Sequence, residues 1–133
     1  MIVLSNTTAQ TLIPGKAITF DEDILHSGTA ECWRRKSSAV KLRSTGVYTV
    51  VFSGNIGGVA AGAAQLTIRL GEVDLPETTM ITTTAAAGDL NHVSTETRVK
   101  NCCGDYDRIT VVNTGTADIT IGANAALIIE RRS

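Results

Sequence analysis

Five side chains of this 133-residue chain carry a thiol or an imidazole, groups that bind metals or act as nucleophiles: His26, His92, Cys32, Cys102 and Cys103. Thiolates and imidazoles together are typical of zinc sites. The spacing does not fit the known zinc patterns, because two cysteines are adjacent and the sequence has no Cys-x-x-Cys or paired-histidine motif. Adjacent residues of a strand point to opposite faces, so both thiols rarely reach one ion. We therefore interpret the cysteines as free thiols that act as small hydrophobic side chains.

Carboxylates offer a second kind of metal chemistry. Asp105 and Asp107 stand two positions apart, and Asp89 or the cluster Asp21–Asp23 could add further oxygen ligands of the kind that calcium prefers. The alternative is that Asp105 caps a turn through its side chain, as Gly-Asp turns commonly do. We expect that the chain requires no cofactor. If these carboxylates bind a metal ion, calcium is the candidate.

Motifs of nucleophilic and phosphate chemistry are absent from the sequence. It has no Gly-x-Ser-x-Gly or His-Glu-x-x-His motif, and Gly54–Gly58 lacks the lysine and the helix of a phosphate loop. His92 and Cys103 would form a nucleophile pair only if the fold brought them together with a third, orienting group. We therefore expect that the chain is not an enzyme.

Trp33, followed by Arg34, is the candidate for ligand binding. An exposed indole flanked by polar groups could stack on a sugar ring. A lone tryptophan more often fills a core or a subunit interface, where it supplies a large apolar area. Both interpretations remain open on the sequence.

The balance of charge limits the classes of partner. Lys and Arg number 12 and Asp and Glu number 13, which gives a formal net charge of −1. A nucleic-acid-binding domain needs a basic surplus on one face, and the dense basic spots are confined to Trp33–Lys36 and Arg131–Arg132, so we expect no nucleic-acid partner. Charged residues make up only 19%, and the mean hydropathy is +0.12. We therefore expect other subunits to cover part of the surface.

The first six residues lack the basic start and apolar core of a signal peptide. No apolar run approaches the length that spans a bilayer. We expect synthesis in the cytosol and no membrane partner.

Alternating side chains predict strands along most of the chain. In Gly46–Asn55, the residues Tyr48, Val50 and Phe52 fall on one face, which is typical of a half-buried strand. The chain contains about eight to ten such segments separated by turns, which predicts one all-β, antiparallel sandwich. We expect residues 1–15 to form an extended arm and residues 16–133 to form the β domain.

The same alternation predicts the inner or subunit-facing core. It consists of the residues on one face of four strands: Tyr48, Val50, Phe52, Leu66, Ile68, Leu70, Ile109, Val111, Leu127 and Ile129. Between the first two of these strands, Gly54–Ala64 is rich in glycine and alanine and is expected to be a loop.

Four motifs follow one another in an order that resembles a known family. They are Gly-x-Tyr-x-Val-x-Phe (Gly46 to Phe52), Leu-x-Ile-x-Leu-Gly (Leu66 to Gly71), Gly-Asp-x-x-x-Ile-x-Val (Gly104 to Val111) and Ala-x-Leu-x-Ile-x-Arg (Ala125 to Arg131). Together they resemble the C1q/TNF-like jelly roll, in the form seen in bacterial and bacteriophage proteins such as the heads of collagen-like spore-surface proteins. The resemblance covers residues 17–132 and includes no Gly-x-y stalk.

The resemblance implies a tight homotrimer. Several jelly rolls of this class bind calcium at the head of the trimer, and His26 near a three-fold axis would be presented three times, to a metal or an anion. The stretch Asn101–Asn113 is also similar to small virion-associated or prophage-encoded proteins of gut Firmicutes.

We therefore expect a non-enzymatic, trimeric structural module of a phage virion, made in the bacterial cytoplasm. It would decorate a capsid or form the head of a fibre, with a capsid or fibre protein as its partner. The alternative is a carbohydrate- or receptor-binding head that uses Trp33 and the loops to hold a cell-surface glycan. A cupin-like barrel enzyme is disfavoured, because it needs clustered metal-binding histidines.

Overall fold

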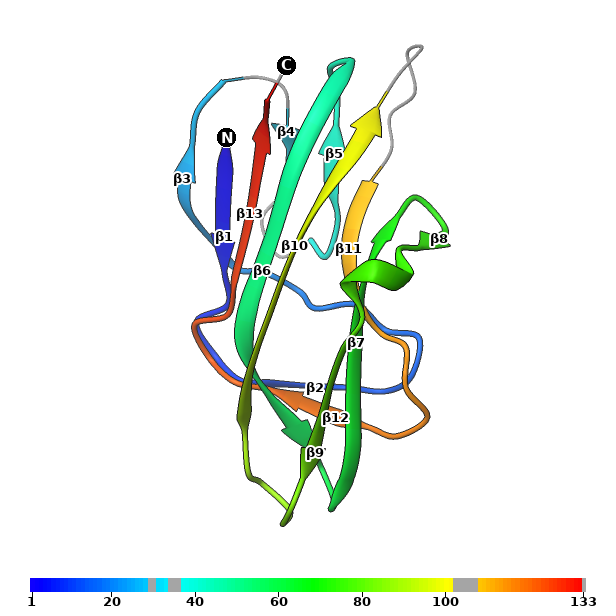
Figure 1. The fold of residues 1–133 in the computed structure, drawn as a ribbon. Helices are drawn as coiled ribbons and strands as arrows, with labels where there is room; N and C mark the ends of the chain where they lie inside the picture. The colour runs from blue at the N-terminus through cyan, green and yellow to red at the C-terminus, as the bar shows by residue number, and fades with distance from the viewer. Residues whose placement is uncertain (29–30, 34–36, 102–107, 133) are drawn as a thin grey trace.

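The computed structural model describes residues 1–28, 31–33, 37–101 and 108–132, which form two antiparallel β-sheets that face each other (Figure 1). Within these residues no helix is long and apolar enough to cross a membrane. A 3-10 turn, η1 (Pro76–Thr78), lies between β8 and β9. The strands are β1 (Ile2–Ser5), β2 (Gln10–Leu12), β3 (Glu22–His26), β4 (Glu31–Cys32), β5 (Val40–Leu42), β6 (Gly46–Gly58), β7 (Gly62–Leu70), β8 (Val73–Asp74), β9 (Met80–Thr84), β10 (Asn91–Asn101), β11 (Arg108–Asn113), β12 (Ile119–Ile121) and β13 (Ala126–Arg131).

The long strand β6 organises the first sheet. One of its edges pairs with β10, and the other pairs with β13 and, further along, with β12. β13 continues to β1 and β1 to β3, while β2 joins β12. The second sheet has the order β4-β5-β11-β7, with β8 and β9 both pairing with β7. Strands distant in sequence thus lie side by side in antiparallel pairs, which confirms the predicted all-β jelly-roll sandwich.

Residues 1–15, for which an extended arm is predicted, supply β1 and β2 to the first sheet. β1 lies between β3 and β13, and Ile2 and Leu4 are fully buried. After β1, the side-chain amide of Asn6 donates to the Gly122 carbonyl at 3.0 Å, and its Oδ1 accepts from the Ala125 N–H at 2.8 Å. These contacts build the segment into the sandwich.

The core lies between the two sheets. Nine of the ten residues predicted for it are 0% exposed within the single chain, and Leu70 is half-buried against them. Leu70 is the last residue of β7, where the chain turns at Gly71, so less of the opposite sheet covers it. Ile18 and Phe20 add two fully buried side chains from the connection between β2 and β3.

The glycine- and alanine-rich stretch 54–64 is mostly strand rather than the expected loop. β6 extends to Gly58 and β7 begins at Gly62, which leaves three residues for the turn. A Cβ at Gly57 would overlap the Asp89 carbonyl oxygen, and a Cβ at Gly58 would overlap the Ala60 carbonyl oxygen. The two glycines therefore permit close approach of backbone at the end of a strand.

Candidate interaction surface

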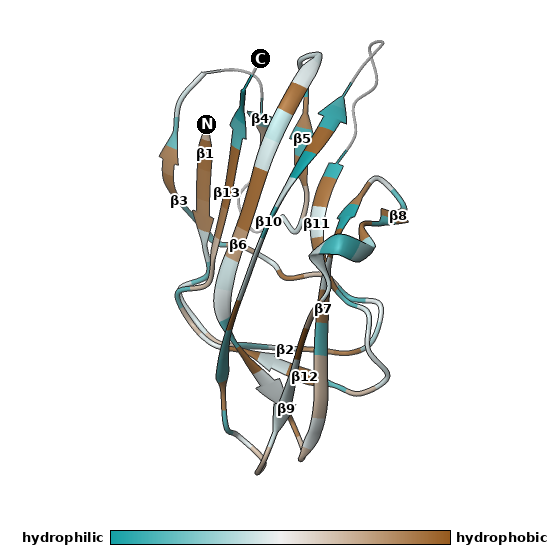
Figure 2. Cartoon of the chain, viewed as in Figure 1, coloured by the Kyte–Doolittle hydropathy of each residue, from teal (hydrophilic) through white to brown (hydrophobic). Residues whose placement is uncertain are grey.

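An apolar row crosses four strands on the outer face of the first sheet. In the strand registers Leu25 lies opposite Val3, Val3 opposite Ile128, and Ile128 opposite Val51. Their neighbours along β1, β6 and β13 point into the core, so these side chains point outward. We call Leu25, Val3, Ile128 and Val51 the apolar row. Figure 2 shows hydrophobic colour along β1 and the adjoining part of β13.

The edge strand β3 adds exposed apolar surface next to this row. All five of its residues are exposed, and Ile24 and Leu25 have 62% and 48% of their surface accessible. The register between β1 and β3 shifts between Val3 and Leu4, which makes Ile24 an extra, bulged residue. Exposed isoleucine and leucine on a strand edge mark a surface suited to association.

A row of small side chains lies beside the apolar row. Ser5 pairs with Ala126, Ala126 with Ser53, and Ser53 with Ser94, two residues further along each strand. Ser5 is buried at one end of this row, and Ala126, Ser53 and Ser94 leave the sheet nearly flat beyond it. A flat strip beside an apolar row lets another protein surface approach closely.

Charges of both signs border the apolar row on its other side. Across three strands, Thr49 stands between Arg98 of β10 and Glu130 of β13. Glu130 is also 3.8 Å from the Arg132 guanidinium. Glu96 of β10 lies directly opposite Val51 and ends the row. An apolar centre with a charged rim is the usual composition of a protein–protein interface.

The side chain of Trp33, predicted to bind ligands together with Arg34, is fixed by core packing and by a hydrogen bond. Its ring is half-buried and packs against the core, and its Nε1–H donates to the Ser37 carbonyl at 3.0 Å. The ring also borders a hollow of about 360 Å³ that is lined by Asp21–Asp23. Arg34 lies outside the described residues.

Of the three predicted metal ligands, the structure describes His26. It lies on the exposed edge strand β3, and its Nε2 is 3.0 Å from the Glu31 carbonyl oxygen. Asp105 and Asp107 lie outside the described residues, so a calcium site on them stays a prediction. Within the described ranges, no group of three or more His, Cys, Asp or Glu side chains converges as metal ligands.

Cys32, the thiol among the described residues, is separated from His92. Cys32 lies on β4 of the second sheet, whereas His92 lies opposite Asn55 in the first sheet. Cys102 and Cys103 lie outside the described residues, so the pairing of His92 with Cys103 is untested.

The pKa of the Tyr48 phenol is shifted because the side chain is buried. Burial raises its pKa above the usual value of 10.0, and hydrogen bonds to Ser44 partly oppose this shift. The hydroxyl donates to the Ser44 carbonyl at 2.7 Å and lies 3.3 Å from the Ser44 N–H. A phenol that ionises less readily is a poor nucleophile or base at neutral pH. Tyr48 therefore ties the turn between β5 and β6 to the core.

The whole fold has relatives among solved structures. No protein-family model matches the chain, and no curated protein matches it in sequence. The globular domain of zebrafish complement 1qA protein aligns over 98% of each chain with a TM-score of 0.67 and 13% identity. Eiger TNF from S. frugiperda covers 99% of this chain and 91% of its own, with a TM-score of 0.75 and 13% identity.

The vertex protein P5 of PRD1 covers 95% of this chain and 93% of its own, with a TM-score of 0.52 and 16% identity. At these identities the likeness establishes the fold alone. The sandwich is thus a jelly roll similar to the C1q and TNF domains, as the order of sequence motifs predicts.

Of the apolar row, Val51 has a signal in the sequence, because it is an apolar residue on the second face of the strand Gly46–Asn55. Val3, Ile128 and Leu25 were missed because they come from distant segments, and only strand pairing aligns them. The sequence of β3 carries a signal for Leu25. Two adjacent apolar residues, Ile24 and Leu25, follow three acidic residues, so the apolar and polar positions do not alternate there.

Proposed function

We propose that this chain is a non-enzymatic structural and interaction module that assembles as a homotrimer through the outer face of the first sheet. The observation that carries the proposal is the apolar row, which crosses four strands without a polar interruption. An apolar strip of this kind on a small domain is a site of protein contact.

A further copy of this chain is the occupant that fits the surface best. The face carries acids, Glu96 and Glu130, and bases, Arg98 and Lys100, so it can offer complementary charges to a copy of itself. Covering Ile24 and Leu25 would add roughly 1 kcal/mol for each half-exposed side chain. The number three comes from the resemblance to the C1q/TNF-like family.

Sedimentation equilibrium tests the assembly. We expect a mass three times that of the 14.0 kDa chain, and a shift to the monomer for Leu25→Glu, because a charge there would be desolvated in the interface. Val73→Glu is the matched control, since Val73 is 66% exposed but lies on β8 of the other sheet. A wild-type mass of 14.0 kDa would refute self-association.

We further propose that the module belongs to a phage virion, where it decorates the capsid or forms the head of a fibre. The similarity of Asn101–Asn113 to virion-associated proteins supports this placement, and so does the likeness in fold to the PRD1 vertex protein. Peptides of the chain should copurify with particles from an induced culture of the encoding bacterium. Their absence from purified particles, with the chain present in the cell lysate, would refute the placement.

A virion protein is the proposed partner in preference to a cell-surface glycan. The indole N–H of Trp33 is already bonded to Ser37, and its ring packs against the core, which leaves less of it for a sugar. On a glycan array we therefore expect no binding that depends on Trp33, so the wild type and Trp33→Ala should give the same result. A signal lost in that variant, with the trimer intact, would establish the glycan-binding alternative.

A further inference from the structure

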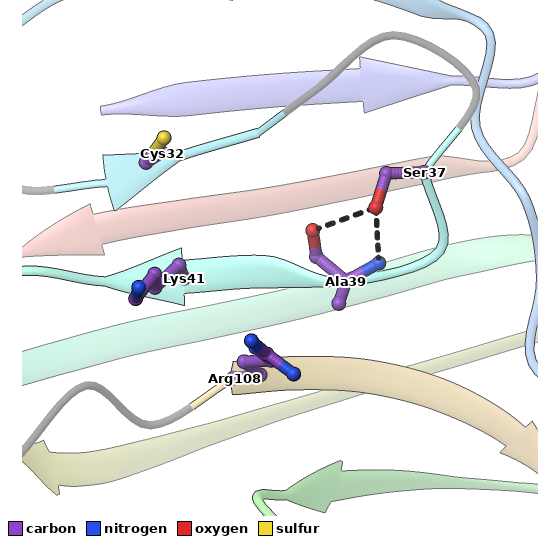
Figure 3. A pocket seen from close by; sticks show the side chains of 5 residues that line it. All are labelled: Cys32, Ser37, Ala39, Lys41 and Arg108. Carbon is purple, nitrogen blue, oxygen red and sulfur yellow. Dashed lines mark hydrogen bonds between the residues drawn. The ribbon is translucent and has the colours of Figure 1, made fainter.

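A second feature lies on the other sheet, away from the proposed association surface. A hollow of about 450 Å³ opens on the outer face of β4, β5 and β11. Figure 3 shows the five side chains that line it: Cys32, Ser37, Ala39, Lys41 and Arg108. A volume of this size is within the range of small-ligand sites.

Three of these side chains form one row across neighbouring strands. Lys41 pairs with Cys32 of β4 on one side and with Arg108 of β11 on the other. Their chain neighbours Glu31, Val40, Leu42 and Ile109 are buried, so the row points outward. Beyond Arg108 the row continues to Gly71, whose N–H donates to the Arg108 carbonyl at 2.8 Å and which has no side chain to cover the guanidinium.

The row places two positive side chains directly opposite each other. Two positive side chains on one outward row make the local potential favourable to an anion. Within the described residues, no carboxylate oxygen lies within 4.0 Å of the Arg108 guanidinium. On the next strand the opposite holds, because Arg69 of β7 donates to Asp74 at 2.7 Å.

The chemistry of the lining fits an oxyanion. A guanidinium offers a planar fork of donors, and an ammonium adds a compact positive charge. The Ser37 hydroxyl lies at the rim, 3.2 Å from the Ala39 N–H, and could turn toward a ligand. Ala39 and Cys32 supply small, weakly polar walls on which the carbon part of a ligand can rest.

We infer that this hollow binds the oxyanion group of a small ligand, a carboxylate or a phosphate, between Lys41 and Arg108. The site is independent of the proposed trimer face, because its residues belong to the other sheet. The sedimentation mass of each variant shows whether the trimer forms, whether or not the hollow binds an oxyanion. A failure of the site can therefore be distinguished from a failure of the proposed function.

Cys32 provides a built-in probe of the charge in the hollow. Trypsin cleavage after Arg34 and Lys100 separates it from Cys102 and Cys103, so its alkylation can be followed in its own peptide by mass spectrometry. Iodoacetate is an anion and iodoacetamide is neutral, and both react with the same thiolate. The ratio of their rates thus reports the local potential, with differences in thiol reactivity cancelled.

We expect Arg108→Gln to lower the iodoacetate-to-iodoacetamide rate ratio at Cys32 by about twofold at low ionic strength, since the charge that is removed lies two strand spacings, about 10 Å, from the thiol in a wet site. Lys16→Gln, which removes one exposed positive charge beside Asn113 at the other end of β11, is the matched control and should leave the ratio unchanged. An unchanged ratio in Arg108→Gln, or an equal fall in the control, would overturn the inference.

Ligand binding is tested by protection of Cys32 from iodoacetamide with three sugars of the same size. Glucuronate carries a carboxylate, glucose 6-phosphate carries a phosphate, and glucose is neutral. We expect saturable protection by at least one of the two acids and none by glucose or by NaCl at matched ionic strength. The acid that protects identifies the oxyanion. Protection by neither acid, or protection that persists in Arg108→Gln, would refute the site.

Discussion

The outer faces of the two sheets differ although they cover the same core. The first sheet presents Leu25, Val3, Ile128 and Val51 in one row, which water hydrates poorly. The second sheet presents Cys32, Lys41 and Arg108 in one row, and two of these side chains are cations. Strand pairing joins apolar side chains in the first row and places two cations opposite each other in the second. The difference indicates that one face is suited to another protein surface and the other to a small, hydrated ligand.

The largest effect should come from the core that the two faces share. Phe52 is fully buried, and Phe52→Ala should lower the free energy of unfolding by about 3–5 kcal/mol, because the truncation removes apolar contacts and leaves a cavity. Urea denaturation measures this loss. Ser53→Ala, the next residue on β6 and on the outer face, should change it by less than about 0.5 kcal/mol. A loss below about 1 kcal/mol for Phe52→Ala would remove that residue from the core.

Asn113 tests the connection between the sheets. Its buried side-chain amide donates to the carbonyls of Leu12 and Ala117 at 3.0 Å each. Asn113→Ala leaves those carbonyls without donors and should cost about 1–3 kcal/mol of unfolding free energy. The exposed Asn55 is the control, and Asn55→Ala should be nearly neutral. Equal effects of the two variants would show that the buried bonds do not stabilise the fold.

A charge placed on each outer face tests the comparison directly. Ile128→Glu puts a carboxylate in the middle of the apolar row and should weaken association at least tenfold, which corresponds to about 1.4 kcal/mol. Thr110→Glu puts the same charge on the outer face of β11 and should leave the association constant unchanged. Sedimentation at several concentrations gives both constants. Weakening by both variants alike would mean that the two faces do not differ in function.

The smallest effect concerns Tyr48 and alkaline pH. The folded chain holds the phenol proton more tightly than the unfolded chain, since burial raises the Tyr48 pKa above 10.0. The stability that this tyrosine contributes is therefore present below about pH 10 and is lost as the pH rises further. Tyr48→Phe should cost about 0.5–1.5 kcal/mol at neutral pH. This deficit should stay constant up to about pH 10 and shrink above it, and a deficit independent of pH would exclude the linkage.

The alternation of side chains predicted the fold and most of the core. β6, β7, β11 and β13 each bury one face, so period two marks their inward residues in the sequence. β3 could not be found in this way, because all five of its residues are exposed and no face alternates. Leu70, predicted for the inner or subunit-facing core, is half-buried and packs against the core, because a strand end receives less cover than a strand centre.

The two outer rows could not be predicted, for a different reason. Each row joins residues from separate segments, such as Leu25 with Ile128 through Val3, or Cys32 with Arg108 through Lys41. The alignment depends on strand order and register, which in this fold pair residues more than a hundred positions apart, such as Val3 with Ile128. Local pattern specifies which side chains face outward but not which of them are neighbours.

The position of β13 has a consequence for synthesis of the chain. β13 lies between β1 and β6 and is the last strand of the described chain, so the first sheet cannot close until residue 131 has been made. Until then β1 and β6 keep unpaired edges beside buried-type residues, and such edges recruit other chains. A nascent chain arrested before Ala126 would therefore aggregate, and ribosome stalling in the final segment would be more harmful to yield than stalling earlier in a loop.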